Sequence, residues 1–257
     1  MSTGVLAIIL VQAVPTSDAV VTPAPAPVSA PAPVSASTPG EIRVIAPVRA
    51  TKEDPLAKTN VQVFAVTEKL DNALVAPVAN GYNAVVPHQL RYGIRNALQN
   101  FKTPVLLGNN ILQLRPKATL HVLVRFVVNS SIGWGGLFDV AARKPINLPY
   151  INNGFGYTLG YYGVKSGPYF FLPLVGPTTL RDAAGGLVDA TVNPRLIGKP
   201  FTRPVYTLGV GSLRSLDSRL EFDEKLQEFR KTDSAYISER NWYLKTRQAE
   251  IDALHGK

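Results

Sequence analysis

Three aspartates are the residues best suited to acid–base chemistry in this chain of 257 residues. Asp139, Asp182 and Asp189 could serve as a general acid and a general base. Arg125 and Arg181 lie in the same part of the sequence and offer these carboxylates ordinary salt-bridge partners. We therefore expect structural ion pairs that involve Asp139, Arg181 and Asp182, and we assign no catalytic residue.

Other catalytic chemistries lack their characteristic residues. Segment 154–160, GFGYTLG, has the spacing G-x-G-x-x-x-G and follows no strand rich in valine and isoleucine, so it departs from the dinucleotide-binding pattern. No G-x-S-x-G elbow occurs, and the chain contains no cysteine. The three histidines, His88, His121 and His255, have none of the spacings that metal sites use. We expect a non-enzymatic protein that uses no cofactor and no metal.

The composition is basic and apolar. The positive net charge suits an acidic partner, and the high apolar fraction needs a separate explanation. The formal net charge is +9, which suits nucleic acid, anionic lipid headgroups or another acidic partner. The basic residues are spread along the chain without interleaved aromatic residues, which argues against nucleic acid. Hydrophobic residues make up 46% of the chain and charged residues 18%, yet no apolar run reaches the ~18 residues that a membrane-spanning helix needs. This combination is typical of a well-filled globule or of a protein that lies in a membrane interface.

The first fifty residues carry little periodic pattern. Residues 1–19 have features of a signal peptide, with an apolar stretch from Val5 to Val14 and small residues ending at Ala19, but they lack a basic start. A tail packed on the surface is the alternative. Residues 20–51 are rich in proline and alanine, which predicts a disordered, extended linker.

The folded part is expected to be all-α, with short helices bounded by proline and glycine. Residues 52–210 form the predicted helical domain. Its first helix has Asp54 as N-cap and is kinked or ended by Pro77, with Gly81 as a stop signal. Segment 167–177, GPYFFLPLVGP, reads as a buried or membrane-inserted irregular segment. Residues 211–257 are charged and helical, with a second helix from Ser234, and could simply pack on the domain.

A single polar line runs along the helix predicted for residues 118–131. His121, Arg125 and Asn129 are spaced four residues apart and therefore share one face, while the other positions are mostly apolar. Such a helix borders an apolar medium on one side and water or a polar ligand group on the other. The equally weighted alternative is that Arg125 pairs with a buried acid such as Asp139 or Asp182. The serines at 130 and 131 should end the helix, and GWGG allows a sharp turn.

Four segments together resemble the MlaA (VacJ) family of outer-membrane lipoproteins. They are DPLAKTN, LDNALVAPVANGY, RFVVNSSIGWGGLFDVA and FGYTLGYYGVKSGPYFFLPLVGPTTLRDAAGGLVD, in this order between about Asp54 and Pro194. The most specific parts are R-F-x-x-N-S at 125–130 and the block from Thr158 to Asp182.

This resemblance implies a ring of short amphipathic helices around a central polar channel, embedded in the inner leaflet of a Gram-negative outer membrane. It further implies phospholipids as cargo, a trimeric outer-membrane porin and a periplasmic lipid carrier as partners, and the removal of mislocalised phospholipids from the outer leaflet. The lining of the channel would include His121, Arg125 and Asn129. The turns at membrane depth would be formed by a set of glycines and prolines, namely Gly133, Gly135, Gly136, Gly167, Pro168 and Pro173.

The sequence departs from the family at three points. Family members carry a lipidated cysteine after the signal peptide, and this sequence has none. The usual Asn-Arg pair of the first helix reads Asn60-Val61, and the family's DFGQ reads GFGY at 154–157. The alternative function is a soluble periplasmic lipid-binding or scaffolding module, and a lipid-modifying hydrolase that uses Asp139 or Asp182 ranks last.

Overall fold

The computed structural model describes residues 48–173, 175–197 and 204–256. The expected signal peptide and all but the last residues of the expected linker lie outside these ranges. The elements in chain order are α1 (Ala57–Leu70), the π-helical turn η2 (Asp71–Val75), α2 (Ala76–Val85), α3 (His88–Phe101), α4 (Thr103–Leu112), α5 (Pro116–Ser131), α6 (Phe155–Tyr161), β1 (Tyr169–Leu172), β2 (Gly176–Thr179), α7 (Leu180–Ile197), α8 (Pro204–Glu221), α9 (Asp223–Arg230) and α10 (Ala235–Leu254).

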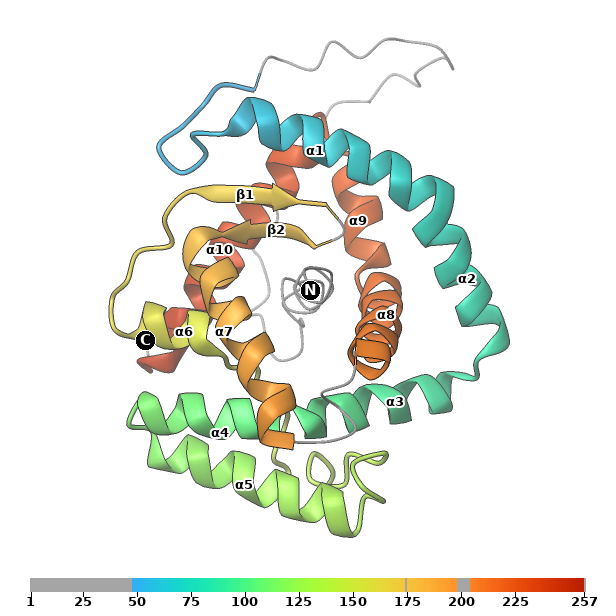
Figure 1. Cartoon of the computed structure of the whole chain (residues 1–257), viewed down its shortest axis with the longest axis vertical. Helices are drawn as coiled ribbons and strands as arrows, with labels where there is room; N and C mark the ends of the chain where they lie inside the picture. The colour runs from blue at the N-terminus through green and yellow to red at the C-terminus, as the bar shows by residue number, and fades with distance from the viewer. Residues whose placement is uncertain (1–47, 174, 198–203, 257) are drawn as a thin grey trace, which may run out of the picture.

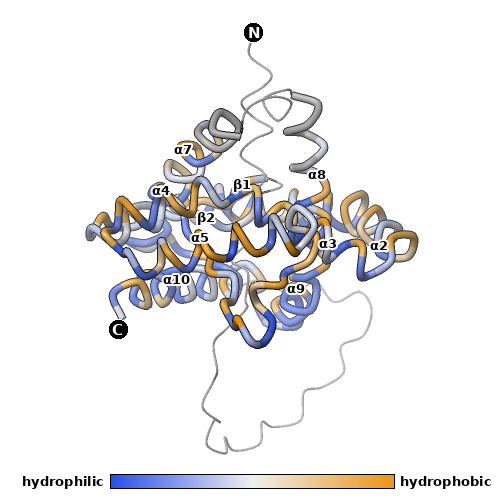
Figure 2. The backbone as a smooth tube through the Cα atoms, turned by 90° about the horizontal axis from the view of Figure 1, so that it is seen from below, coloured by the Kyte–Doolittle hydropathy of each residue, from blue (hydrophilic) through white to orange (hydrophobic). Residues whose placement is uncertain are grey.

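The helices follow one another around a ring (Figure 1). One arc consists of α1, α2 and α3, and α4 and α5 continue it, with α5 on the outer side of α4 (Figure 1). Contacts of α8 with α2 and α3 join the C-terminal half to this arc, and α10 contacts α6 and β2. Viewed from the side, the ring is flat (Figure 2). Within the described part of the chain, no helix combines the length and the apolar character needed to cross a membrane.

The expectation of a mostly helical protein is confirmed, with one exception. Segment 167–177 was expected to be irregular, and this is wrong, because it contributes to an antiparallel hairpin in which Tyr169 pairs with Thr179 and Leu172 with Gly176. Tyr169 and Phe171 point into the core, while the residues between and after them are only partly buried. The run Tyr-Phe-Phe-Leu hides this alternation in the sequence because both faces carry apolar residues.

The first helix begins later than the sequence suggests. Asp54 is not its N-cap, since α1 starts at Ala57 and the buried Asp54 carboxylate instead accepts hydrogen bonds from Asn60 and Tyr236. This contact holds the segment before α1 against α10, which lies at the other end of the chain. A carboxylate held by buried donors is not available to cap a helix.

The predicted break at Pro77 is also displaced. Pro77 occupies the first turn of α2, where its missing N–H group is tolerated, and η2 joins α1 to α2 without interruption. Gly81 lies inside α2, which ends at Val85. Val86 is extended, as expected for a residue before a proline.

The C-terminal helices belong to the core of the ring. The expected boundary between residues 210 and 211 falls inside α8. Tyr236 and Tyr243 of α10 pack with Tyr169 and Phe171, and other α10 residues pack on α6. Ser234 caps α10, as predicted, since its hydroxyl accepts a hydrogen bond from the Ile237 amide.

Candidate functional site

Helix α5 presents two different surfaces. It begins at Pro116 and ends at Ser131, close to the predicted limits, and it buries Val122, Arg125 and Asn129. Its exposed face is apolar and includes Leu120, Leu123 and Val127. The sequence prediction of one polar line on an apolar helix therefore describes α5 well.

The polar line contacts the segment that follows α5. Nη2 of Arg125 lies 3.0 Å from Oδ2 of Asp139, and Nη1 donates to the carbonyl of Leu148. Nδ2 of Asn129 donates to Oδ1 of Asp139 over 3.0 Å, and its Oδ1 accepts from the Ala141 amide. The ion pair considered for Arg125 is therefore present.

His121, the third member of the line, contacts the same segment. Its Nε2 lies 2.8 Å from the carbonyl oxygen of Pro149. All three side chains thus fix the path of residues 139–149 along α5. A role in lining a channel stays a prediction for them.

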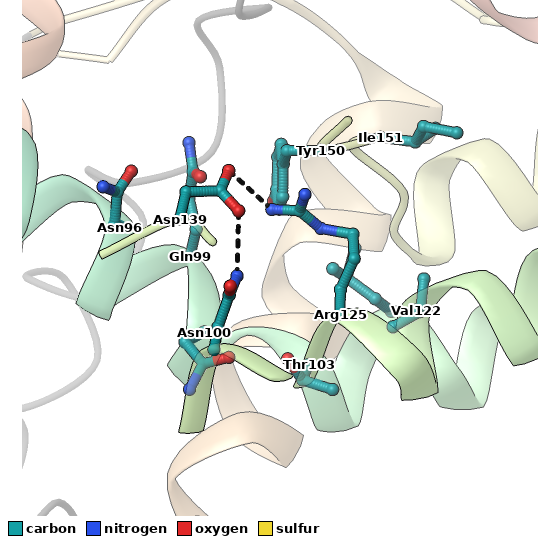
Figure 3. Close-up of a pocket in the computed structure, with 11 residues that line it drawn as sticks. Asn96, Gln99, Asn100, Thr103, Val122, Arg125, Asp139, Tyr150 and Ile151 are labelled. Atoms are coloured by element: carbon teal, nitrogen blue, oxygen red, sulfur yellow. Dashed lines mark hydrogen bonds and ion pairs between the residues drawn. The ribbon is translucent and has the colours of Figure 1, made fainter. Parts of the chain in front are cut away.

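A polar pocket lies beside this line (Figure 3). Helix α3 contributes the amide side chains of Asn96, Gln99 and Asn100, and α5 contributes Arg125 and Asn129. Asp139 and Tyr150 of the following segment and Thr103 of α4 complete the polar lining. The apolar lining consists of Leu106, Val122 and Ile151. The Arg125 guanidinium carbon lies 5.7 Å from the centre of the Tyr150 ring.

The chemistry of this pocket suits recognition rather than catalysis. Both carboxylate oxygens of Asp139 are engaged, one by Arg125 and one by Asn129. Asp139 therefore holds Arg125 and Asn129 in place. The amides offer both donors and acceptors, which fits an uncharged or zwitterionic polar group.

The predicted turn after α5 is built on its glycines. Gly135 and Gly136 have φ angles of +69° and +96°, in the region that favours glycine. A Cβ atom on Gly136 would lie 2.6 Å from Cβ of Asn100. The turn therefore fits closely against α3, and Asn100 also donates to the Ser130 hydroxyl over 2.9 Å.

The remaining predicted turn residues lie at three places. Gly133 is crowded by the backbone of Asn129 and Phe138, so the turn there requires the absence of a side chain. Gly167 has a φ of +70° and precedes Pro168, whose carbonyl accepts from the Leu180 amide. Pro173 follows the end of β1 directly.

Asp182 is held between two arginines. Its Oδ1 lies 3.1 Å from Nε of Arg181, and its Oδ2 lies 3.1 Å from Nε of Arg247. The Tyr243 hydroxyl donates to Oδ2 over 2.7 Å. Burial raises the pKa of Asp182. The two arginines and the tyrosine lower this pKa by more than burial raises it, so the pKa lies below its usual value. The expected ion pair of Arg181 with Asp182 is present, while Arg247 gave no local signal in the sequence.

Asp189 belongs to a buried network of amides. It accepts hydrogen bonds from the Phe155 amide and from Nδ2 of Asn109. Gln113 donates to Asn153 and to Thr158, each over 2.9 Å. Burial raises the pKa of Asp189. This network joins α4, α6 and α7, and sequence reasoning did not find it, because its members come from three separate segments.

In the three described ranges, no group of three or more histidine, aspartate or glutamate side chains is arranged to hold an ion.

The profile of the MlaA lipoprotein family matches residues 52–250. This chain belongs to the MlaA lipoprotein family. The match includes α8, α9 and nearly all of α10.

Relatives and a solved structure agree with this assignment. The intermembrane phospholipid transport system lipoprotein MlaA of Shigella flexneri is 33% identical over 195 residues, which cover 75% of this chain and 76% of the relative. An uncharacterized protein of Rickettsia typhi is 31% identical over 202 residues, or 77% of this chain and 78% of that protein. A solved structure described as the structural basis for maintenance of bacterial outer membrane lipid asymmetry has a TM-score of 0.66 and 32% identity, and it covers 77% of this chain and 98% of that chain.

Proposed function

We propose that this protein is a non-enzymatic phospholipid transport component of the outer membrane. It removes mislocalised phospholipids from the outer leaflet and passes them to a periplasmic carrier, which maintains lipid asymmetry. Membership of the MlaA lipoprotein family supports this role, as do relatives named for intermembrane phospholipid transport.

The observation that carries the proposal is the apolar outer surface of the ring. Leu120, Leu123 and Val127 lie on one face of α5 and are all exposed. Other large apolar side chains are exposed on α1 and α2, and Figure 2 shows hydrophobic segments along α2, α4 and α5. An apolar perimeter of this extent on a flat ring fits a protein that lies within one leaflet.

The polar pocket supplies the other requirement of the proposed role. A phospholipid headgroup needs hydrogen-bonding partners while its acyl chains stay among apolar groups. Arg125 and Asn129 border the pocket with the α3 amides, so they would contact the headgroup while Asp139 holds them in place. A trimeric porin and a periplasmic carrier complete the proposed pathway.

A gene deletion tests the transport role. We expect the deletion strain to accumulate phospholipid in the outer leaflet, measured with an outer-membrane acylating enzyme, and to become sensitive to detergent. Expression of the intact chain should restore both. Unchanged asymmetry in the deletion strain would contradict the proposal.

A membrane wash separates the proposed role from the alternative of a soluble lipid-binding module. The intact protein should stay in membranes washed with carbonate, because its apolar face is buried in lipid. The double substitution Leu123→Glu and Val127→Glu should release it, since charges on this face must leave the hydrocarbon. Lys117→Glu changes the net charge by the same amount at an exposed polar position of α5 and should leave the protein bound. Release of the intact protein by the wash would favour the soluble module.

A further inference from the structure

The turns at the two ends of α5 each present one bulky apolar residue in an unfavourable backbone conformation. Leu114 lies between α4 and α5, Trp134 lies just after α5, and both have a φ angle of +53°. Leu114 is 81% exposed and Trp134 is 76% exposed. Asn147 is the third non-glycine residue with a positive φ in the described ranges, and asparagine tolerates this region well. The two bulky residues therefore carry a conformational cost that packing within the chain does little to offset.

The turn that carries Trp134 is held against α3 and α5. Nδ2 of Asn96 donates to the Leu137 carbonyl over 3.2 Å. The Gly136 amide donates to the Asn129 carbonyl over 2.7 Å. The fold therefore fixes this turn and holds Trp134 away from the protein interior.

The turn that carries Leu114 is fixed by its buried neighbour. Gln113 is fully buried, and its side-chain amide donates to Asn153 and to Thr158. This anchoring leaves Leu114 on the outside of the turn. Both tips are thus presented by well-bonded segments of the ring.

Apolar side chains connect the two turns along α5. Leu120, Leu123 and Val127 share one face of the helix and are exposed. Segment 131–138, SIGWGGLF, contains no charged residue, although exposed turns are usually polar. Further exposed apolar side chains lie at the two ends, namely Ile111, Leu112, Ile132, Leu137 and Phe138. We call this set, together with Leu114 and Trp134, the α5 edge.

The α5 edge is long and lies in the plane of the ring. Helix α5 runs along the outer side of the flat ring (Figures 1 and 2). Its 16 residues span about 24 Å, so the two turns lie that far apart along the edge. A partner that covers both turns must be apolar and extended over this distance. The acyl region of a phospholipid leaflet has these properties, and the chain belongs to a lipoprotein family.

We propose that the α5 edge lies parallel to the plane of a phospholipid bilayer, with Leu114 and Trp134 inserted among the acyl chains at the same depth. Transfer of each bulky side chain from water into lipid offsets the cost of its backbone conformation. The indole N–H group keeps Trp134 near the headgroup end of the chains. This orientation rests on the proposed location of the ring within one leaflet.

Tryptophan fluorescence in vesicles measures the depth of the turn after α5. The sequence has two tryptophans, so Trp242→Phe leaves Trp134 as the only one. The full chain is reconstituted into vesicles of phosphatidylethanolamine and phosphatidylglycerol. These vesicles also contain phosphatidylcholine brominated either near the headgroup end or near the methyl end of its acyl chains. We expect the bromines near the headgroup end to quench Trp134 about twofold more strongly.

Trp134→Phe is the matched control variant. It leaves Trp242, which is partly buried and packs against Phe222 with the ring centres 5.0 Å apart, so both lipids should quench it weakly. The difference in quenching between the wild type and Trp134→Phe also isolates the signal of Trp134 without the need for Trp242→Phe.

A second probe at the other end of α5 tests the orientation. Leu114→Trp is introduced into a chain that carries both phenylalanine substitutions, and its quenching ratio should equal that of Trp134. Leu112→Trp provides a probe at the same end if circular dichroism shows that Leu114→Trp does not fold. A clearly different ratio at the two ends would overturn the proposal, since it would mean that the α5 edge is tilted in the bilayer.

Weak quenching of Trp134 by both brominated lipids would also overturn the proposal. Quenching by iodide in the aqueous phase would then place the turn in water. Protection from iodide would instead identify a second copy of this chain as the partner that covers the turn.

The gene deletion distinguishes this proposal from the transport role. Trp134 among the acyl chains, together with unchanged lipid asymmetry in the deletion strain, would support the α5 edge and contradict transport. Loss of asymmetry together with Trp134 in water would support transport and refute the α5 edge.

Discussion

Arg247 and Asp182 form a buried ion pair that joins the last helix of the ring to α7. Nε of Arg247 lies 3.1 Å from Oδ2 of Asp182, and the two side chains are 7% and 6% exposed. The guanidinium carbon of Arg247 also lies 4.3 Å from the centre of the Tyr157 ring on α6. One arginine of α10 therefore contacts both α6 and α7, which makes this pair a point of closure between distant parts of the chain.

Removal of Asp182 should destabilise the ring strongly. Asp182→Ala leaves Arg181 and Arg247 buried without their shared partner, which costs roughly 3–5 kcal/mol. Urea unfolding followed by circular dichroism measures the loss. Asp233→Ala changes an exposed acid before α10 and should unfold at nearly the wild-type urea concentration. Equal midpoints for the two variants would show that the ion pair does not stabilise the ring.

The same carboxylate predicts an acid limit of stability. Burial raises the pKa of Asp182, but Arg247, Arg181 and Tyr243 lower it more, so its folded pKa lies below the unfolded value near 3.8. Such a group stabilises the fold above the unfolded pKa, and this stabilisation is lost as the pH falls through the folded pKa. The wild type should therefore lose its advantage over Asp182→Asn below about pH 4 in thermal melts. A difference in melting temperature that stays constant from pH 7 to pH 2 would contradict this prediction.

Glu239 predicts the opposite dependence on pH. Burial in α10, together with the negative charges of Glu68 and Asp71, raises its pKa to about 8 in spite of Arg230. Since the folded state binds this proton more tightly than the unfolded state, stability falls as the pH rises from about 4.5 to 8. Glu239→Gln cannot ionise, so it should match the wild type near pH 5 and exceed it by a few kcal/mol above pH 8.

A matched variant checks that the effect comes from burial. Glu224→Gln replaces an exposed acid of α9 and should follow the wild-type pH profile. Thermal melts of all three proteins at pH 5, 7 and 9 decide the matter. Parallel profiles for Glu239→Gln and the wild type would mean that Glu239 is ionised at neutral pH in the fold.

Local signals in the sequence predicted those helix ends that are set by the residues at the ends themselves. Pro116 and Ser131 mark the limits of α5, and Ser234 caps α10, because a proline at the first turn and a serine at the N-cap act on the nearest backbone groups. The spacing of four residues placed His121, Arg125 and Asn129 on one face for the same reason. Family resemblance added the ring, which no local pattern indicates.

Contacts between distant segments could not be predicted in this way. Asp54 reads as an N-cap, but its hydrogen bond to Tyr236 spans 182 positions of the chain. Arg247 meets Asp182 across 65 positions, and the sequence contains many other arginines that could have done so. Sequence patterns describe faces and ends, whereas these contacts depend on how the ring closes.

Arg125 and Asp139 should show strong energetic coupling. Each single change to alanine leaves the other charge largely buried, whereas the double change removes both charges. The double variant should therefore lose less free energy of unfolding than the two single variants lose together. We expect a coupling energy of about 1–2 kcal/mol from chemical unfolding. Additive losses would show that Arg125 is stabilised mainly by the Leu148 carbonyl or the Tyr150 ring. The rate of lipid removal by Arg125→Met is a separate measurement. It tests the role of the pocket and not the stability of the fold.

Two glycines should respond in opposite directions to the same substitution. Gly136→Ala places a methyl group 2.6 Å from Cβ of Asn100 at a φ of +96°, which should cost about 1–3 kcal/mol. Gly81→Ala adds a methyl group to the interior of α2 with no atom within 4 Å, and should stabilise by up to about 1 kcal/mol. Thermal melts of the two variants measure this difference under identical conditions. If Gly136→Ala were neutral, the turn after α5 could move away from α3 without cost, and the close fit that shapes one wall of the pocket would not be required for stability.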